Sequence, residues 1–256
     1  MSLRVIVTRP ASQADDWAGR LGLHGLDAVA LPLIRIVAAA RTDELQAAWA
    51  ALDNLQLIVF VSPNAVEQFF SHRGGFGWPT TLRAGSTGPG TTRELIGHGV
   101  PAAQIVAPAA DAAQLDSEAL WAQLQELPWS GARVLFVRGQ AGRDWLADTL
   151  RARGAQVTQV AAYGREAPAF TPAQLALLDQ ALQQPQRHLW LFSSSQAVDN
   201  LRDLGGPQGE RAWPRSRALA THPRIAQRAH EVGFAHVLQA LPQFDAVVSC
   251  IQSIEL

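Results

Sequence analysis

Three hydroxyl residues stand where extended apolar runs give way to helical segments. Ser62 follows the run that begins at Leu57, Ser194 follows the run that begins at Leu189, and Thr91 lies in the glycine-rich turn Ser86–Thr92. Such turns expose the backbone N–H groups of a helix N-terminus, which attract carboxylates or phosphates together with the helix dipole. The spacing therefore predicts anion binding at these turns, although each residue could instead be an ordinary helix cap.

Arginines stand at equivalent strand ends. Arg9, Arg138 and Arg143 offer planar forks that suit carboxylates, and Gly139 would let a ligand approach the main chain closely. A solvated surface arginine is the alternative for each of them. All 21 basic residues are Arg, so lysine Schiff-base chemistry and a Walker lysine are both excluded.

Other chemistries find little support in the sequence. His222 has no His, Asp or Glu at ligand spacing, which argues against a metal site. No Ser/His/Asp order and no paired carboxylates emerge, and neither Gly88-Pro-Gly90 nor Gly139–Arg143 matches a nucleotide-binding pattern. We therefore expect neither a metal nor a cofactor.

The elements that position these turns alternate along the chain. Short β-branched runs such as Leu3–Thr8 and Val134–Arg138 alternate with helical segments such as Ser12–Leu23 and Asp116–Leu127, which is typical of parallel sheets covered by helices. The glycine-rich stretches 74–77 and 205–209 are predicted to be surface loops.

The chain also repeats itself. Phe60–Val66 resembles Phe192–Val198, and two further pairs recur in the same order at an offset of about 130 residues. The extended stretches Leu31–Ile36 and Ala161–Glu166 occupy equivalent places, and the second carries the only tyrosine, Tyr163. If both stretches cross between domains, the middle of the chain forms one domain and its two ends form the other. Two consecutive domains joined by one linker remain the alternative.

Composition narrows the class of protein. The chain has 256 residues, of which 48% are hydrophobic, and its net charge is -1, so a nucleic-acid partner is not expected. The single cysteine, Cys250, rules out an internal disulfide and is expected to be a small core residue. No signal peptide or membrane-spanning run is evident, which predicts a cytoplasmic protein without a membrane partner.

Together these motifs resemble the uroporphyrinogen-III synthase family. The resemblance is carried in order by Val7–Pro10, Phe60–Val66, Gly88–Thr91, Asp116–Leu120, Arg138–Arg143, Tyr163–Arg165, Phe192–Val198 and Thr221–Ala226. It implies two similar flavodoxin/Rossmann-like parallel-sheet α/β domains joined by a two-stranded crossing. By the resemblance, one domain spans 1–34 plus 168–256, the other spans 38–162, and the crossings are 34–38 and 162–168.

The resemblance also implies an activity. Members of the family close the linear tetrapyrrole hydroxymethylbilane into uroporphyrinogen III, losing water and inverting ring D through a spiro intermediate, without a cofactor. Such chemistry needs a protein that folds a flexible substrate into one reactive shape in a cleft between the domains. Tyr163 is then expected to assist departure of the hydroxyl. Substrate binding falls to Thr8, Arg9, Ser62, Thr91, Arg138, Gly139, Arg143, Ser194, His222 and Arg224. We expect this chain to be a monomer.

One position departs from the family pattern, and other functions compete with the enzyme. Arg224 stands where many relatives keep a small hydroxyl residue, so the carboxylate there would be held differently. A cytoplasmic two-domain ligand sensor would use the same turns only to hold an anion. A periplasmic-type binding protein would need a signal peptide, and an amino-acid racemase of duplicated α/β type would need paired cysteines.

Overall fold

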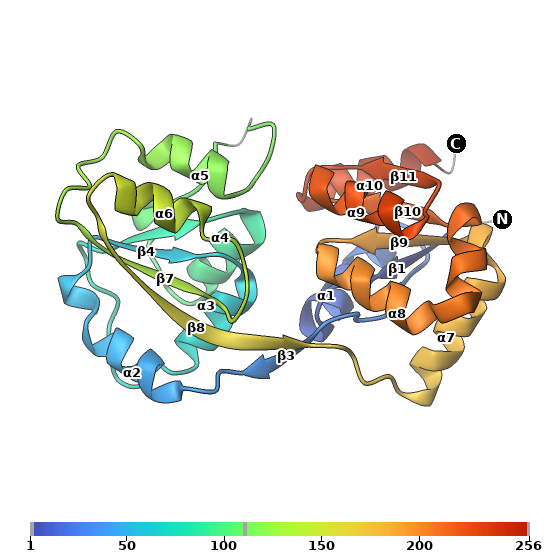
Figure 1. Ribbon diagram of the computed structural model, residues 1–256, viewed down its shortest axis with the longest axis horizontal. Coiled ribbons are helices and arrows are strands. Elements are labelled where there is room, and N and C mark those ends of the chain that lie inside the picture. The colour runs from blue at the N-terminus through green and yellow to red at the C-terminus, as the bar shows by residue number, and fades with distance from the viewer. Residues whose placement is uncertain (1–2, 110–111, 255–256) are drawn as a thin grey trace. The chain divides into compact units, whose positions relative to one another are not determined.

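The computed structural model describes residues 3–109 and 112–254 and divides into two compact units (Figure 1). Unit 1 comprises Met1–Arg35 and Glu166–Leu256, and unit 2 comprises Ile36–Arg165. Each unit contains its own sheet with helices on both faces.

Unit 1 contains a five-stranded sheet in the order β11-β10-β9-β1-β2, in which every neighbouring pair is parallel. Its strands are β1 (Arg4–Val7), β2 (Ala28–Ala30), β9 (His188–Phe192), β10 (Arg217–Ala220) and β11 (His236–Gln239). Its helices are α1 (Ala11–Leu23), α7 (Pro172–Gln183), α8 (Ser195–Ala212), α9 (Pro223–Val232) and α10 (Phe244–Ile254).

Unit 2 is built on a six-stranded sheet in the order β3-β8-β7-β4-β5-β6. Its strands are β3 (Arg35–Ala38), β4 (Leu57–Phe60), β5 (Arg83–Ser86), β6 (Ile105–Val106), β7 (Arg133–Gly139) and β8 (Gln156–Glu166). Its helices are α2 (Thr42–Ala50), α3 (Pro63–Phe70), α4 (Pro89–Gly97), α5 (Ser117–Leu124) and α6 (Trp145–Ala152). Short 3-10 turns complete the two units at Leu52–Asn54, Ala102–Gln104, Pro185–Arg187 and Trp213–Arg215.

The two sheets have equivalent strand orders. Reading β6-β5-β4-β7-β8 in unit 2 against β11-β10-β9-β1-β2 in unit 1 places β4 with β9 and β7 with β1. This is the flavodoxin-like order, and its switch point lies between β4 and β7 in one unit and between β9 and β1 in the other. The predicted fold of two similar parallel α/β sheets is therefore confirmed.

Strand β3, which pairs with the long strand β8 at the sheet edge, leads the chain into unit 2, and the end of β8 leads it out. Arg35 at the start of β3 forms an ion pair with Glu166 at the end of β8.

Alternation along the strands builds a core on each face of the unit 2 sheet. Ile58 and Phe60 of β4 pack with α2, α3 and α4, whereas Leu57 and Val59 pack with α5 and α6. Successive side chains of a strand point to opposite faces, so a four-residue apolar run fills both layers. Burial on both faces holds the strand ends, and the turns that follow them, in fixed positions.

The prediction of a surface loop at 205–209 was wrong, because these residues lie within α8. The helix kinks at Gly206, whose φ of 48° is left-handed, and Pro207 follows it. Gly205 and Gly209 are buried against the indole of Trp213, so the glycines serve close packing.

Candidate functional site

In unit 2 the predicted site residues lie at the carboxyl ends of the strands beside the switch point. Ser62 follows β4, Gly139 ends β7, and Tyr163 lies near the end of β8. Strands β4, β7 and β8 run parallel, and Gly139 is in register with Tyr163. These residues therefore lie together at the carboxyl ends of the strands, where open α/β sheets bind ligands.

A hydrogen bond joins Ser62 to Tyr163. The Ser62 Oγ and Tyr163 Oη atoms are 2.9 Å apart, and either can be the donor. Ser62 is also the N-cap of α3, and its Oγ accepts the backbone N–H of Ala65 at 3.1 Å. Pro63 at the first helical position fits this start because its fixed φ suits a helix and it has no N–H to satisfy. The predicted turn is thus an ordinary cap and also the partner of the only tyrosine.

Arg165, which was not among the predicted site residues, is a third member of this group. Its Nη2 donates to Tyr163 Oη at 2.8 Å, and its guanidinium carbon lies 5.4 Å from the centre of the Tyr163 ring. Residues two apart on a strand lie on the same face, so the sequence Tyr163-Gly-Arg165 carried a usable signal.

Tyr163 is held tightly by unit 2. Its side chain is fully buried in the core that lines one face of the sheet. Its ring packs on the main chain of Gly139, and its carbonyl accepts the N–H of Gln140 at 3.0 Å. A β-bulge between Arg138 and Gly139 creates this register. Within residues 3–109 and 112–254, the phenol hydroxyl forms hydrogen bonds with Ser62 and Arg165 only.

The glycine-rich turn before α4 uses different hydroxyls from the predicted one. Ser86 Oγ donates to the carbonyl of Gly88 at 2.9 Å and lies 2.8 Å from Thr92 Oγ1. The predicted Thr91 is buried within the first turn of α4. Gly88 caps the helix without a side-chain hydrogen bond, which leaves first-turn N–H groups available to a ligand.

Arg138 is engaged by groups of its own unit. The guanidinium is buried and forms an ion pair with Asp144, and its Nη1 also donates to Gln159 Oε1 at 3.1 Å. Gln159 Nε2 donates to Asp144 as well, at 3.1 Å. These hydrogen bonds, led by that of Gln159, lower the pKa of Asp144 below its ordinary value. Arg138 thus fixes the turn that follows β7.

Arg143, on the same turn, binds a carboxylate of the protein in the bidentate geometry that was predicted for a substrate carboxylate. Its two terminal nitrogens donate to the two oxygens of Glu118, at 2.6 and 2.9 Å. This bidentate pair raises the pKa of Arg143, and both side chains are exposed. A substrate carboxylate would therefore have to compete with Glu118.

In unit 1, Thr8 and Arg9 follow β1 but are placed differently. Thr8 is buried, and its Oγ1 donates to the carbonyl of Leu191 at 2.7 Å, so it ties β1 to β9 beside the switch point. The Arg9 guanidinium carbon lies 4.2 Å from the centre of the Trp17 ring, a stacking geometry typical of a cation on an indole.

The other unit 1 residues cap helices after β9 and β10. Ser194 is the N-cap of α8 but makes no side-chain hydrogen bond to the first turn of that helix. His222 caps α9, and its Nδ1 accepts the N–H of Arg224 at 3.1 Å. The other ring nitrogen, Nε2, lies 3.4 Å from Arg224 Nη2. His222 is therefore placed as a cap for α9.

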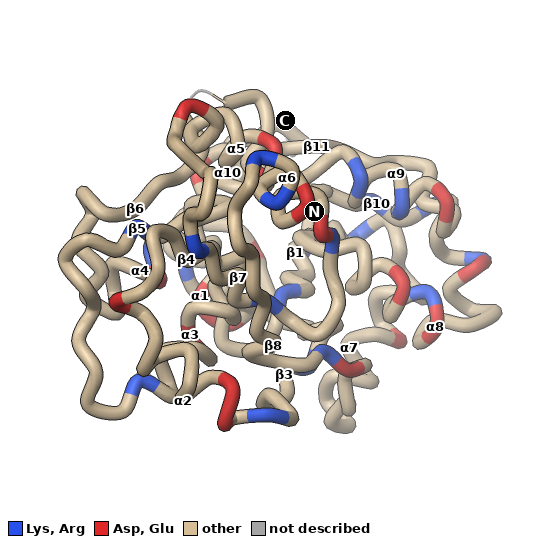
Figure 2. The backbone as a smooth tube through the Cα atoms, turned by 60° about the vertical axis from the view of Figure 1, so that its left-hand side comes forward, with Lys and Arg blue, Asp and Glu red and all other residues tan. Residues whose placement is uncertain are grey.

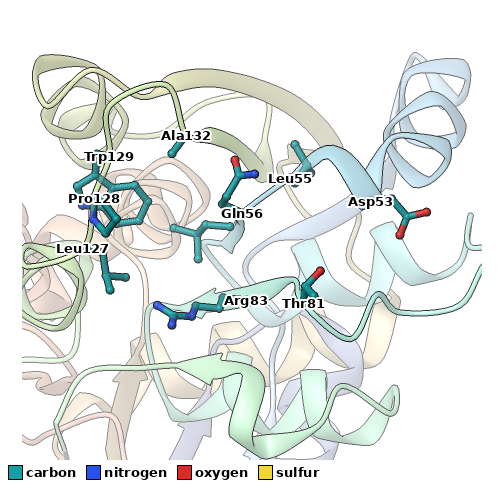
Figure 3. A pocket seen from close by; sticks show the side chains of 10 residues that line it. Asp53, Leu55, Gln56, Thr81, Arg83, Leu127, Pro128, Trp129 and Ala132 are labelled. Atoms are coloured by element: carbon teal, nitrogen blue, oxygen red, sulfur yellow. The ribbon is translucent and has the colours of Figure 1, made fainter.

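A cavity of about 370 Å³ lies at the opposite end of the unit 2 strands (Figure 3). In this view Leu127, Pro128 and Trp129 line one side and Asp53 and Leu55 the other. Its further lining residues are Gln56, Leu57, Thr81, Arg83 and Ala132. Because β4 begins at Leu57 and β5 at Arg83, the cavity lies at the amino ends of the strands, away from Ser62 and Tyr163.

Acidic and basic positions are interspersed along the backbone of each unit (Figure 2). Across residues 3–109 and 112–254, no three His, Cys, Asp or Glu side chains are grouped so that they could hold a metal ion. In the same part of the chain, no helix has the length and apolar character needed to span a membrane.

Comparison with known proteins identifies relatives over nearly the whole chain. The model of the HEM4 family, described as uroporphyrinogen-III synthase HemD, matches residues 15–249. The uroporphyrinogen-III synthase of Salmonella typhimurium is 31% identical over 246 residues, which cover 92% of this chain and 94% of that protein. The enzyme of the same name from Escherichia coli K12 is 30% identical over 239 residues, with the same coverage.

Solved structures share the fold. The crystal structure of uroporphyrinogen-III synthetase from Helicobacter pylori has a TM-score of 0.61 at 15% identity, covering 99% of this chain and 100% of that one. A mutant uroporphyrinogen III synthase from Thermus thermophilus gives 0.61 at 16% identity, covering 99% and 98%. On the family match and the relatives' identity, this chain belongs to the uroporphyrinogen-III synthase family.

Proposed function

We propose that this protein is a uroporphyrinogen-III synthase: it converts hydroxymethylbilane to uroporphyrinogen III and water, with inversion of ring D through a spiro intermediate. The observation that carries the proposal is the family match over residues 15–249. Within unit 2, the hydrogen-bonded Ser62 and Tyr163 lie at the carboxyl ends of the strands, where such a fold binds its ligand.

The chemistry fits a site with few acid–base groups. Loss of the substrate hydroxyl leaves a stabilised cation, which the last pyrrole attacks at its substituted carbon before the spiro intermediate fragments and recloses. The protein must chiefly hold the chain in the shape that leads to inversion. Tyr163 and its hydrogen-bond partners assist departure of the hydroxyl by donating a hydrogen bond toward the leaving oxygen.

The substrate's carboxylates are bound at the strand-end turns of both units. In unit 2 the carboxylate oxygens accept hydrogen bonds from the first-turn N–H groups at Ser62 and Thr91 and from the main chain of Gly139. The guanidinium groups of Arg138 and Arg143 bind further carboxylates. In unit 1 the corresponding turns carry Thr8, Arg9, Ser194, His222 and Arg224. The open cap of α4 and the Ser194 hydroxyl, which makes no hydrogen bond to the first turn of α8, support this assignment.

The enzyme acts in the cytoplasm as a monomer without a metal or an organic cofactor. Segments 1–34 plus 168–256 and 38–162 serve as its two domains, with 34–38 and 162–168 as the crossings between them. Dialysis against a chelator is expected to leave turnover unchanged, and light scattering during gel filtration is expected to give the mass of one chain.

A product-isomer assay tests the function directly. Purified protein is mixed with freshly prepared hydroxymethylbilane, and the oxidised products are separated by chromatography. We expect the type III isomer, formed faster than the spontaneous type I isomer in a reaction without protein. Formation of the type I isomer alone, at the spontaneous rate, would contradict the proposal and favour a ligand-binding role.

A further inference from the structure

Arg165, Tyr163 and Ser62 form a chain of hydrogen bonds that ends on one hydroxyl. We propose that Ser62 is the catalytic residue that touches the substrate, and that Tyr163 and Arg165 are positioning residues that act through it. This inference rests on the proposed function and assigns a donor for the loss of water. Its basis is the pair of contacts at 2.8 Å and 2.9 Å that link the three side chains.

The direction of the outer hydrogen bonds is fixed by the chemistry of their donors. A guanidinium can only donate, so Tyr163 Oη accepts from Arg165 Nη2. A backbone N–H can only donate, so Ser62 Oγ accepts from Ala65 at 3.1 Å. Only the middle bond, between Tyr163 and Ser62, is open to either direction.

The acidity of the phenol and the charge of Arg165 set the direction of the middle hydrogen bond. A phenol is a stronger acid than an alkyl alcohol and is therefore the better donor. The positive guanidinium of Arg165 draws electron density from the phenol oxygen, which strengthens its O–H as a donor. Tyr163 thus donates to Ser62. Ser62 Oγ then accepts two hydrogen bonds, and its own proton is left for a third partner.

Burial decides which hydroxyl meets the substrate. Tyr163 is 0% exposed, and its ring is packed on the main chain of Gly139. Ser62 is partly exposed and stands at the turn that follows β4. A ligand at the carboxyl ends of these strands therefore reaches the Ser62 hydroxyl without moving the tyrosine out of the core.

The loss of water balances along this chain. As the carbon–oxygen bond of the substrate breaks, the departing oxygen takes the Ser62 proton and leaves as water. The Tyr163 proton moves to Ser62 Oγ, and the phenolate that remains faces the Arg165 guanidinium. After ring closure the pyrrole carbon gives up its proton to Ser62 Oγ as the Ser62 proton moves back to the Tyr163 phenolate, so the enzyme ends in its starting state.

A double-mutant cycle tests whether Arg165 acts through Tyr163. We expect Ser62→Ala, Tyr163→Phe and Arg165→Leu each to lower kcat by about tenfold or more. Arg165→Leu is expected to leave KM within about twofold, because the proposal assigns its guanidinium to Tyr163 Oη and not to a substrate carboxylate. In the Tyr163→Phe background, adding Arg165→Leu should lower kcat by less than about twofold. Fully multiplicative losses would overturn the proposal.

Matched variants separate this effect from a change in folding. Arg133→Leu removes an exposed arginine of the same charge from the amino end of β7, and we expect wild-type kcat. Ser62→Thr keeps both the hydroxyl and the capping oxygen and should recover at least about a third of the wild-type kcat. Recovery in Ser62→Thr to no more than the Ser62→Ala level would contradict a role for the hydroxyl.

The single tyrosine provides a readout without substrate. Because Tyr163 is the only tyrosine, protein labelled with carbon-13 at tyrosine Cζ gives one resonance from this side chain. Arg165→Leu and Ser62→Ala are expected to move that resonance, and Arg133→Leu is expected to leave it in place. An unmoved resonance in Arg165→Leu would refute the hydrogen-bonded chain.

The two proposals fail in different ways. A wild-type protein that makes no type III product refutes the proposed function, whatever the resonance shows. A wild-type protein that makes type III product, with Ser62→Ala turning over at the same rate, refutes only the role of Ser62.

Discussion

The Tyr163 ring lies against the main chain of Gly139 so closely that a Cβ at residue 139 would stand 3.1 Å from both Cε2 and Cζ and 3.4 Å from Oη. The ring is enclosed in the core, so it would have to shift by a few tenths of an ångström. We expect Gly139→Ala to lower kcat by about tenfold through displacement of the phenol from Ser62. The loss of unfolding free energy should be about 1 kcal/mol.

The rate of type III product formation and urea denaturation measure these two effects. Gly97→Ala is the matched control, because a Cβ at residue 97 meets no atom within 4 Å. That variant should keep the wild-type kcat and stability. A Gly139→Ala enzyme with wild-type kcat would show that the ring position has no bearing on turnover.

Local patterns were enough to predict the fold and the turns. Ser62 and Ser194 could be located because each follows a buried strand and precedes a helix, and both are N-caps in the structure. The repeat indicated two similar sheets, since equivalent segments recur at a nearly constant offset. The strand-to-helix turns involve residues that are close together in the chain, and the repeat can be seen by comparing the two halves of the chain. A single sequence is therefore enough to reveal both signals.

The partners of the site residues could not be predicted in this way. The contact between Ser62 and Tyr163 joins residues 101 positions apart and depends on the pairing of β4, β7 and β8. The pairing of Arg143 with Glu118 likewise depends on how α5 packs beside the turn after β7. Thr91 was expected to present its hydroxyl at the glycine-rich turn, but α4 already begins at Pro89 and buries it, and Ser86 and Thr92 form the hydroxyl pair.

Gly209 in α8 should be intolerant of any side chain. A Cβ there would stand 2.4 Å from Cζ2 of Trp213, which is itself buried, so the indole or the helix must move. We expect Gly209→Ala to cost about 2–3 kcal/mol of unfolding free energy, measured by urea denaturation. Gly22→Ala in α1 has no atom within 4 Å of its Cβ and should not be destabilised. Equal stability of the two variants would refute the packing argument.

Glu118 should act as an internal competitor for the substrate. Its carboxylate occupies both terminal nitrogens of Arg143, so removing its charge frees the guanidinium for a substrate carboxylate. We expect Glu118→Gln to lower KM by about threefold and Arg143→Gln to raise KM by about threefold or more, with kcat changed little in either.

Steady-state kinetics with hydroxymethylbilane measures these opposite shifts. Arg151→Gln removes an arginine that forms an exposed ion pair with Asp148 within α6, and it should leave KM unchanged. If both Glu118→Gln and Arg143→Gln raise KM, the ion pair itself supports the site, and Arg143 does not bind substrate.

The Asp144 carboxylate should make the stability of unit 2 depend on pH in the acid range. Hydrogen bonds from Gln159 and Arg138, together with the Arg138 charge, hold the pKa of Asp144 below its ordinary value of 3.8. Because the pKa is lower in the folded state, the unfolded state binds protons more readily as the pH falls. The stabilisation is therefore complete above about pH 4 and is lost as the pH falls through the folded pKa.

Thermal unfolding at several pH values tests this sign. Wild-type protein should unfold at a higher temperature than Asp144→Asn at about pH 6, and the difference should shrink as the pH approaches about 3. Asp53→Asn is the charge-matched control, because the Asp53 carboxylate forms no hydrogen bond or ion pair within residues 3–109 and 112–254. Its difference from wild type should not shrink in this way. A gap between wild type and Asp144→Asn that stays constant down to pH of about 3 would mean that Asp144 contributes through the shape of its hydrogen bonds and not through its charge, because protonation would then leave its contribution intact.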